Sequence, residues 1–225
     1  MTAGPTREPF DPSRFISNAS SGRMGYALAA EAAARGGEVT LITGPTQLAP
    51  PTGVQVVRVK TADEMFRATL NQAQGADLVL KAAAVSDYRP EAHARGKIKK
   101  ETLLRRAGSR STADRAISLR LLPTPDILAE LGRRRKPNQV LVGFAAESGD
   151  LERNARRKLR LKNLDLVIAN RIGSEGEGFE SATNRAIVID RRGRRTLLPL
   201  MSKADMAGAI LDLAEPFLDP GHRQE

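Results

Sequence analysis

Short apolar runs alternate with helix-like segments along most of the chain. The runs are rich in Val, Ile and Leu, as is typical of strands buried on both faces. They cover residues 38–43, 54–59, 77–85, 140–144 and 164–169. Helical or capping patterns fall between them, at residues 27–34, 61–74, 124–132 and 151–161. This alternation predicts an α/β, Rossmann-like fold: a mostly parallel sheet with helices on both faces.

The two ends of the chain add further expected elements. Thr2-Ala3-Gly4 resembles the end of a first strand, preceded only by Met1. This indicates an unusually short strand, or a start that was cut or mis-assigned. Near the other end, residues 184–190 and 195–200 flank a basic, glycine-containing turn and predict an antiparallel hairpin. A last helix follows from a Ser202 cap to about Ala214, and residues 216–225 are expected to fray.

The 225 residues suit one domain, residues 1–225, without internal repeats. One segment departs from the alternating pattern. Residues 92–116 are charged and poor in large apolar side chains. A segment of this kind predicts a flexible flap inserted into the domain and not a part of its core.

Composition excludes several kinds of chemistry. There is no cysteine and there are only two histidines, which excludes disulfides, a thiolate nucleophile and cysteine zinc ligands, and disfavours a Ser-His-Asp triad. No apolar run could span a bilayer and the N-terminus lacks a signal region, so we expect a cytoplasmic protein without a membrane partner.

The chain carries a net charge of +10, which favours anionic ligands, and a basic nucleic-acid-binding protein is one alternative. Aromatic residues are only 4% and tryptophan is absent, so stacking platforms for single strands are scarce. We therefore expect no nucleic-acid partner.

A second alternative is a nicotinamide-dependent reductase. Gly22-Arg23-Met24-Gly25 opens an alanine-rich helix and suits a phosphate at its N-terminus. However, a long polar loop separates it from Gly4, whereas the dinucleotide fingerprint follows its strand directly. The acidic ribose ligand expected after the second strand is also replaced by Thr43-Gly44-Pro45. Both features count against a dinucleotide site.

Four polar segments carry the chemistry that the sequence offers. The loop at residues 4–22 supplies Arg7 and Arg14 for anions and Asn18 as a neutral donor and acceptor. Further polar or small residues follow at 82–90, 97–100 and 143–147. Such loops cluster where parallel strands end, so these segments predict a ligand site.

Together with residues 14–18 and 123–127, these segments resemble phosphopantothenoylcysteine synthetase, the ligase half of the fused bacterial coenzyme A enzyme. The resemblance covers the chain from Thr2 to about Ala214. It implies a ligase that joins 4′-phosphopantothenate to L-cysteine through an acyl-nucleotide (CMP) intermediate with release of pyrophosphate. It also implies CTP (ATP less so) and Mg²⁺, a homodimer, and a separate decarboxylase protein.

The resemblance assigns roles to single residues. Asn18 and Lys97 match catalytic positions, and Arg14, Asn18 and Ala84 match substrate contacts. Asp87 matches an aspartate placed either near the triphosphate and metal or in the base-recognition loop. Nucleotide contacts match Ser20, Ser21, Gly22, Ala83, Ala84, Asp87, Lys97, Phe144, Ala145, Lys158 and Lys162.

For several of these residues a structural role stays open. Asn18 and Asp87 also suit turn caps, and Phe144 equally suits a core aromatic. Lys158 and Lys162, four apart, also suit a solvated helix face. The chain departs from the family pattern at several positions: Pro5 stands where a glycine is usual, Arg23 where a lysine is common, Lys81 where an apolar residue is usual, and Arg171 where a carboxylate is common.

Overall fold

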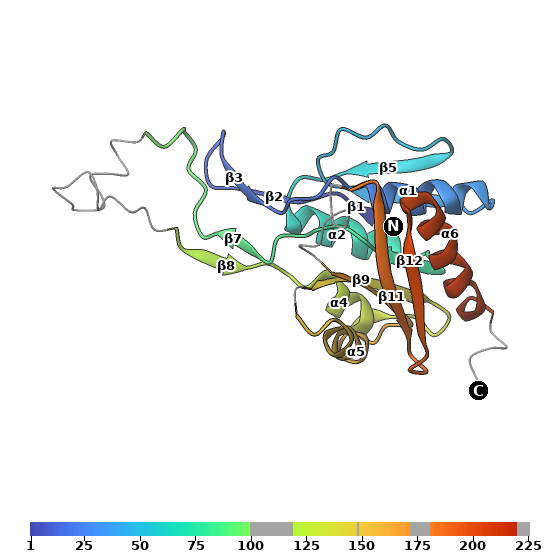
Figure 1. The fold of residues 1–225 in the computed structure, drawn as a ribbon. Helices are drawn as coiled ribbons and strands as arrows, with labels where there is room; N and C mark the ends of the chain where they lie inside the picture. The colour runs from blue at the N-terminus through green and yellow to red at the C-terminus, as the bar shows by residue number, and fades with distance from the viewer. Residues whose placement is uncertain (100–118, 148, 172–180, 220–225) are drawn as a thin grey trace.

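We describe a computed structural model of the chain, for residues 1–99, 119–147, 149–171 and 181–219. Its centre is an eight-stranded sheet in the order β12-β11-β10-β9-β6-β1-β4-β5 (Figure 1). The strands from β5 to β10 in this order are parallel to one another. β11 pairs antiparallel with β10, and β12 pairs antiparallel with β11. Their bounds are β1 Thr2–Ala3, β4 Val39–Thr43, β5 Val54–Arg58, β6 Leu78–Lys81, β9 Val140–Glu147, β10 Leu166–Arg171, β11 Thr183–Asp190 and β12 Arg195–Ser202.

Helices cover both faces of this sheet. Leu28 of α1 and Met206 of α6 belong to the core on one face, and Met65 of α2, Leu128 of α4 and Leu159 of α5 to the core on the other. The mostly parallel α/β sheet and the C-terminal hairpin predicted from the sequence are therefore confirmed. The helices are α1 Arg23–Ala34, α2 Ala62–Ala73, α4 Ile127–Arg134, α5 Leu151–Leu161 and α6 Lys203–Ala214.

Local capping explains where the helices begin. Thr61 and Glu64 form the expected capping box at α2, which satisfies amides that the first helical turn leaves free. Asp126, Asp150 and Ser202 each accept a hydrogen bond from an amide in the first turn of α4, α5 and α6. Within the described residues, no helix is both long enough and apolar enough to cross a membrane.

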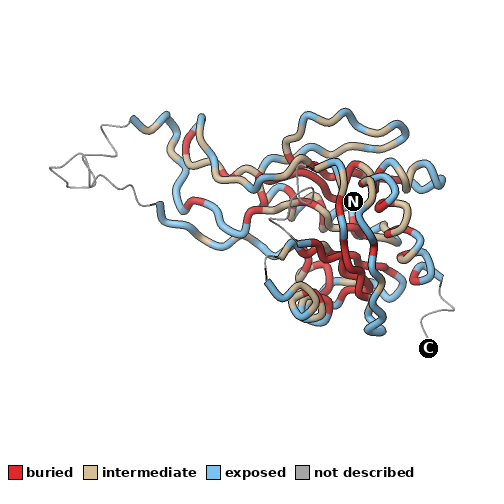
Figure 2. The backbone as a smooth tube through the Cα atoms, in the orientation of Figure 1, coloured by how far each residue is buried: buried red, intermediate tan, exposed pale blue. Residues whose placement is uncertain are grey.

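The long polar loop contains structure that the sequence analysis missed. Strands β2 (Arg7–Pro9) and β3 (Phe15–Ser17) form an antiparallel hairpin, and β7 (Tyr88–Pro90) pairs with β8 (Leu121–Pro123). We call these four strands, with the described residues that adjoin them at 10–14, 91–99 and 119–120, the arm. It projects from one side of the sheet (Figure 1). Figure 2 shows the arm mostly exposed or partly exposed, whereas the central strands are largely buried. With so few buried side chains, the arm strands lack the continuous apolar runs that marked the others.

Two further expectations were wrong. The strand predicted to continue to residue 85 ends at Lys81, because the Ala83 amide donates to the Thr2 hydroxyl and not to a strand carbonyl. Beyond this break the pairing with the first strand continues only as a single parallel bridge between Pro5 and Ala84. The expected fraying fails at Pro216 and Phe217, which belong to the 3₁₀ helix Glu215–Phe217, and Phe217 is buried in the core. Residues 100–116 of the expected flap and residues 220–225 lie outside the described part of the chain.

The first strand is short and lies at the centre of the sheet, where Thr2–Ala3 pairs with both β4 and β6. Helix α1 packs closely over it through Gly25. A Cβ on Gly25 would lie 2.5 Å from the Ala3 Cβ and 2.8 Å from the Thr2 carbonyl oxygen. Those distances are too short for a methyl group, so the position requires glycine.

We predict that Gly25→Ala destabilises the protein, although alanine is the better helix former. The helix propensity gain is about 1 kcal/mol, whereas forcing a methyl group into packed backbone costs about 1–3 kcal/mol. Urea unfolding measures the difference. Gly208→Ala in α6 is the matched control, because its Cβ would meet Arg35 only at 3.6 Å, an ordinary contact. Gly208→Ala should raise the free energy of unfolding by about 0.5–1 kcal/mol. An equal gain for Gly25→Ala would contradict the close packing.

Candidate functional site

The loops that follow the carboxyl ends of β1 and β6 are joined by main-chain hydrogen bonds. The Ala84 amide donates to the Gly4 carbonyl at 3.0 Å, and the Thr6 amide donates to the Ala84 carbonyl at 3.3 Å. The buried Thr6 hydroxyl accepts from the Ser86 amide at 2.9 Å. These bonds hold small residues against one another at the sheet edge, where ligands of such folds bind.

Asn18 reaches this loop junction from the end of β3. Its Nδ2 donates to the Val85 carbonyl at 3.0 Å and to the Ala84 carbonyl at 3.3 Å. Because both neighbours are acceptors, the amide nitrogen faces them, and Oδ1 points the other way. The structure thus brings together Asn18 and Ala84, two residues that the sequence analysis placed in one site.

The N-terminus of α1 lies beside the same junction. Gly22 is the N-cap of the helix and has a left-handed backbone (φ 79°). It lies close to Gly4: a Cβ added to Gly22 would be 3.2 Å from the Gly4 Cα. The Gly22 amide donates to Ser20 Oγ at 3.4 Å, and no side-chain hydrogen bond caps the helix at Gly22. First-turn amides of this kind bind phosphate oxygens. Ser20, Ser21 and Gly22 thus lie at the N-terminus of α1, where a phosphate could be bound.

Three lysines border the ends of β6 and β9. Lys81 Nζ donates to the Ala83 carbonyl at 3.0 Å, and Lys158 Nζ donates to the Phe144 carbonyl at 2.8 Å. Lys162 forms an ion pair with the helix-capping Asp126. In the described part of the chain, neither Lys81 nor Lys158 forms an ion pair with a carboxylate. Lys158 and Lys162 are thus partly buried and hydrogen-bonded, unlike residues of a solvated helix face.

Desolvation of these ammonium groups perturbs their titration. Burial above all, together with the charge of Lys158, lowers the pKa of Lys81 to about 8, against the opposing effect of Asp126 and Asp87. Burial also lowers the pKa of Lys158. Two desolvated cations that repel each other form a site prepared for an anion. The sequence analysis noted Lys81 as a departure but did not count it in the site. A lysine that ends an apolar run was the available signal.

The remaining strand-end residues show mixed roles. Phe144 packs against the core beneath α1 and α6, whereas its carbonyl faces the site through Lys158. Ala145 is fully buried, so only its main chain could contact a ligand. Asp87 is exposed, and its carbonyl accepts from the Thr124 amide at 2.9 Å. Thr124 also donates to the Ser86 carbonyl at 2.6 Å, which ties the motif at residues 123–127 to this loop.

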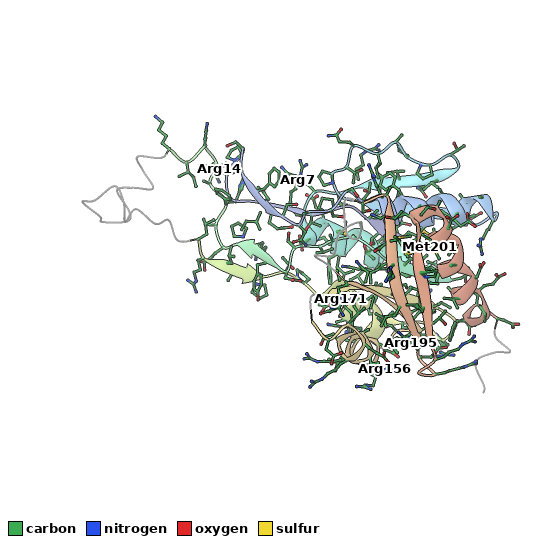
Figure 3. The ribbon with its side chains drawn as sticks, in the orientation of Figure 1. Arg7, Arg14, Arg156, Arg171, Arg195 and Met201 are labelled. Atoms are coloured by element: carbon green, nitrogen blue, oxygen red, sulfur yellow. The ribbon has the colours of Figure 1, made fainter. Side chains whose placement is uncertain are left out.

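Among the described residues, no group of three or more His, Cys, Asp or Glu side chains could hold a metal ion. Arg171 ends β10 opposite Glu147 of β9, exposed near the same sheet edge (Figure 3). It adds positive charge to this edge of the sheet.

Two predicted site residues lie apart from this edge. Arg14 is far out on the arm, beyond Arg7 (Figure 3). Its guanidinium binds Asp11 and donates to the Ile98 carbonyl at 2.7 Å, which places Lys97, the neighbour of Ile98, on the arm as well. Within one chain the structure therefore does not bring Arg14 and Lys97 to the strand-end residues.

We predict that Lys81→Met stabilises the protein near neutral pH. The folded protein binds the Lys81 proton below about pH 8, whereas the unfolded chain keeps it up to the ordinary lysine pKa of 10.5. Between those pH values the unfolded chain binds more protons, so the free energy of unfolding of the wild type increases as the pH rises. Below them the wild type carries the full cost of the buried charge, and Lys81→Met should be about 1–3 kcal/mol more stable at pH 7.

The difference should shrink by pH 10, as urea unfolding at both pH values would measure. Lys60→Met at an exposed position is the control and should stay within about 0.5 kcal/mol of wild type. A Lys81→Met variant that is no more stable at pH 7 would contradict the desolvated ammonium.

Comparison with known proteins agrees with this geometry. Residues 1–217 match the family described as DNA/pantothenate metabolism flavoprotein C-terminal domain. The chain is 43% identical over 212 residues to the coenzyme A biosynthesis bifunctional protein CoaBC of Bacillus subtilis (strain 168), covering 94% of this chain and 49% of that protein. It therefore spans about half the length of that relative.

Solved structures share the fold. The C-terminal domain of a coenzyme A biosynthesis bifunctional protein CoaBC has a TM-score of 0.77 at 38% identity, covering 96% of this chain and 93% of that one. A Cab2 mutant in complex with phosphopantothenate-cysteine has a TM-score of 0.74 at 18% identity, covering 96% and 86%. At that identity the likeness concerns the fold alone. The chain belongs to the DNA/pantothenate metabolism flavoprotein C-terminal domain family, as its resemblance to phosphopantothenoylcysteine synthetases implied.

Proposed function

We propose that this chain is a cytoplasmic ligase of coenzyme A biosynthesis that joins 4′-phosphopantothenate to L-cysteine, with CTP as the activating nucleotide. The observation that carries the proposal is the pair of desolvated lysines, Lys81 and Lys158, at the strand ends beside the loop held by Asn18. Cations without carboxylate partners suit a polyanionic nucleotide. The family favours this reading over a nucleic-acid-binding protein or a nicotinamide-dependent reductase.

The chemistry needs two steps. A carboxylate oxygen of 4′-phosphopantothenate attacks the α-phosphorus of CTP, the bond to the β-phosphate breaks, and pyrophosphate leaves. The cysteine amine then attacks the acyl carbon, the acyl–oxygen bond breaks, CMP leaves and the amine loses its proton. Neither step demands a histidine or a thiolate from the protein, which agrees with a chain that has no cysteine.

The residues of the site divide these tasks. The amides at the start of α1, with Ser20 and Ser21, suit phosphate oxygens, and Lys158 and Lys162 suit negative charge at the sheet edge. We assign the base and ribose to main-chain groups of Ala83, Ala84, Phe144 and Ala145, because the family resemblance implies main-chain contacts of this kind.

Asn18 has a defined orientation, because its Nδ2 is bound to the Ala84 and Val85 carbonyls. Its Oδ1 is left to accept from a ligand N–H group, such as the attacking amine. A contact from Nδ2 to the acyl oxygen would require the side chain to give up one of the two carbonyls.

A magnesium ion fits this site only together with the nucleotide. Mg²⁺ is commonly held by one or two carboxylates and by substrate phosphates. The exposed carboxylate of Asp87 at the strand-end loop is the group that would share it with the triphosphate. The ion would neutralise phosphate charge during the first step.

We also propose that the active form is a homodimer joined through the arm. Lys97 and Arg14 lie on the arm, away from the strand ends, so a second copy offers a way to complete the site. The arm also exposes large apolar side chains, as a contact surface requires. Their exposed fractions are 43% for Phe15, 55% for Tyr88, 43% for Leu119 and 41% for Leu121.

Pyrophosphate release tests the function directly. With CTP, Mg²⁺ and 4′-phosphopantothenate, we expect turnover only when cysteine is added, and slower turnover with ATP. Asn18→Asp should lower product formation by about 100-fold or more, because the new charge repels both the carbonyls of Ala84 and Val85 and the acyl phosphate.

Leu197→Glu, at an exposed position on the edge strand β12, is a control that should keep wild-type turnover. Folded wild-type protein that releases no pyrophosphate with either nucleotide would reject the proposed reaction. Full activity of Asn18→Asp would remove only the role given to Asn18.

The dimer has a separate test in analytical ultracentrifugation. We expect wild-type protein to sediment as a dimer at micromolar concentration. The double substitution Tyr88→Glu and Leu121→Glu should give monomers, because it places charges in the apolar surface of the arm. Leu197→Glu should stay dimeric. A monomeric wild type, or a dimer that persists in the double variant, would reject the arm as the interface.

A further inference from the structure

Asp11 is a buried carboxylate at the turn of the β2–β3 hairpin, with 1% of its surface exposed. Its Oδ1 accepts from the Ser13 amide at 2.9 Å, the Ser13 hydroxyl at 3.0 Å and the Arg14 amide at 2.8 Å. Its Oδ2 accepts from Arg14 Nε at 2.9 Å and from Arg14 Nη2. The Arg14 hydrogen bonds hold the pKa of this carboxyl well below its usual range, so Asp11 is ionised at neutral pH.

The Asp11–Arg14 ion pair also binds the backbone of Ile98, which lies 84 positions after Arg14 in the chain. Asp11 Oδ2 accepts from the Ile98 amide at 3.2 Å, and Arg14 Nη2 donates to the Ile98 carbonyl at 2.7 Å. The hairpin also accepts from the Ala94 amide at the Phe10 carbonyl, at 3.0 Å. The backbone amide and the backbone carbonyl of Ile98 are thus both hydrogen-bonded to side chains of the hairpin, an arrangement that we call the grip.

The position of this grip bears on the lysines beside it. Ile98 lies between Lys97 and Lys99, which are both exposed. Fixing the backbone on both sides of Ile98 fixes the backbone from which Lys97 projects, and it removes conformational freedom that the exposed lysine would otherwise lose on binding a ligand.

We propose that Asp11 and Arg14 are positioning residues for Lys97, acting through the main chain of Ile98. This inference rests on the proposed function, because it takes Lys97 as a nucleotide-binding residue. It gives Arg14 a different part from the direct substrate contact implied by the family resemblance, since its Nε and Nη2 are engaged by Asp11 and Ile98. The planar fork of arginine is needed, because a lysine cannot bind Asp11 through two nitrogens and still reach Ile98.

Two readouts test the proposal. Hydrogen–deuterium exchange of a peptide covering residues 94–99 reports the grip itself, without any substrate. Hydrogen bonds to charged groups are strong enough that losing one should speed exchange of the Ile98 amide by about tenfold or more. Asp11→Asn and Arg14→Lys should both show this. Asp63→Asn, which breaks the exposed ion pair with Arg67 on α2, is the matched control and should show no change there.

Steady-state kinetics report the consequence. Asp11→Asn and Arg14→Lys should raise KM for CTP by about tenfold, with a smaller effect on kcat. In a Lys97→Gln background the same substitutions should change KM less than about twofold, because the group being positioned is gone. This non-additivity distinguishes positioning of Lys97 from general damage to the arm. If Asp11→Asn fails to fold, Arg14→Lys provides the same test.

The outcomes are distinct. Unchanged exchange at residues 94–99 in both variants would overturn the grip. Faster exchange with unchanged KM, or an undiminished effect in the Lys97→Gln background, would overturn the positioning role. A wild-type protein without turnover would reject the proposed function, whereas the exchange measurement would still decide whether the hairpin holds Ile98.

Discussion

The close approach of α1 to the central strand β1 sets the position of the site. β1 has only two residues, so the loops at its end are held chiefly by contacts with their neighbours. Gly25 lets the helix lie on Ala3, and Gly22 lets the helix begin against Gly4. The helix amides and the β6 loop therefore meet at one point. A larger residue at either glycine would separate the phosphate-binding end of α1 from the loop that carries Ala84 and Asn18.

The second constraint is electrostatic. Lys81 and Lys158 lie where water cannot fully solvate them, and each donates to a main-chain carbonyl instead of pairing with a carboxylate. Such an arrangement is unfavourable in the absence of a ligand and becomes favourable when an anion arrives. Lys162 differs, because Asp126 already balances its charge while capping α4. The site thus combines two lysines that donate to main-chain carbonyls, Lys81 and Lys158, with a third, Lys162, whose charge is balanced by Asp126.

Much of the fold could be predicted because the buried strands carry uninterrupted apolar runs and the helices carry caps. The capping box at Thr61 and the Ser202 cap each fixed an element boundary to within a residue. The arm could not be predicted in this way, since β2, β3, β7 and β8 are three residues each and expose much of their surface.

For the site, the polar loops correctly placed Asn18 beside Ala84, but the segment that carries Lys97 lies on the arm and not at the strand ends. The parts that depend on long-range contacts were not accessible: the desolvation of Lys81 and the pairing of Asp11 with Ile98 arise only when distant segments fold together.

The β7–β8 pair also has a consequence for how this protein tolerates change. At its outer end the Glu91 amide donates to the Arg120 carbonyl at 2.9 Å, and the two side chains form an ion pair at 3.2 Å. The chain is therefore held together at Glu91 and Arg120, whatever the length of the segment between them. For a flexible segment, joining two such ends costs only about 0.6 kcal/mol more for each doubling of its length. Length added between residues 99 and 119 should therefore cost the sheet little free energy of unfolding, so an engineered tag or reporter can be inserted there without displacing Lys97 from the hairpin that holds Ile98.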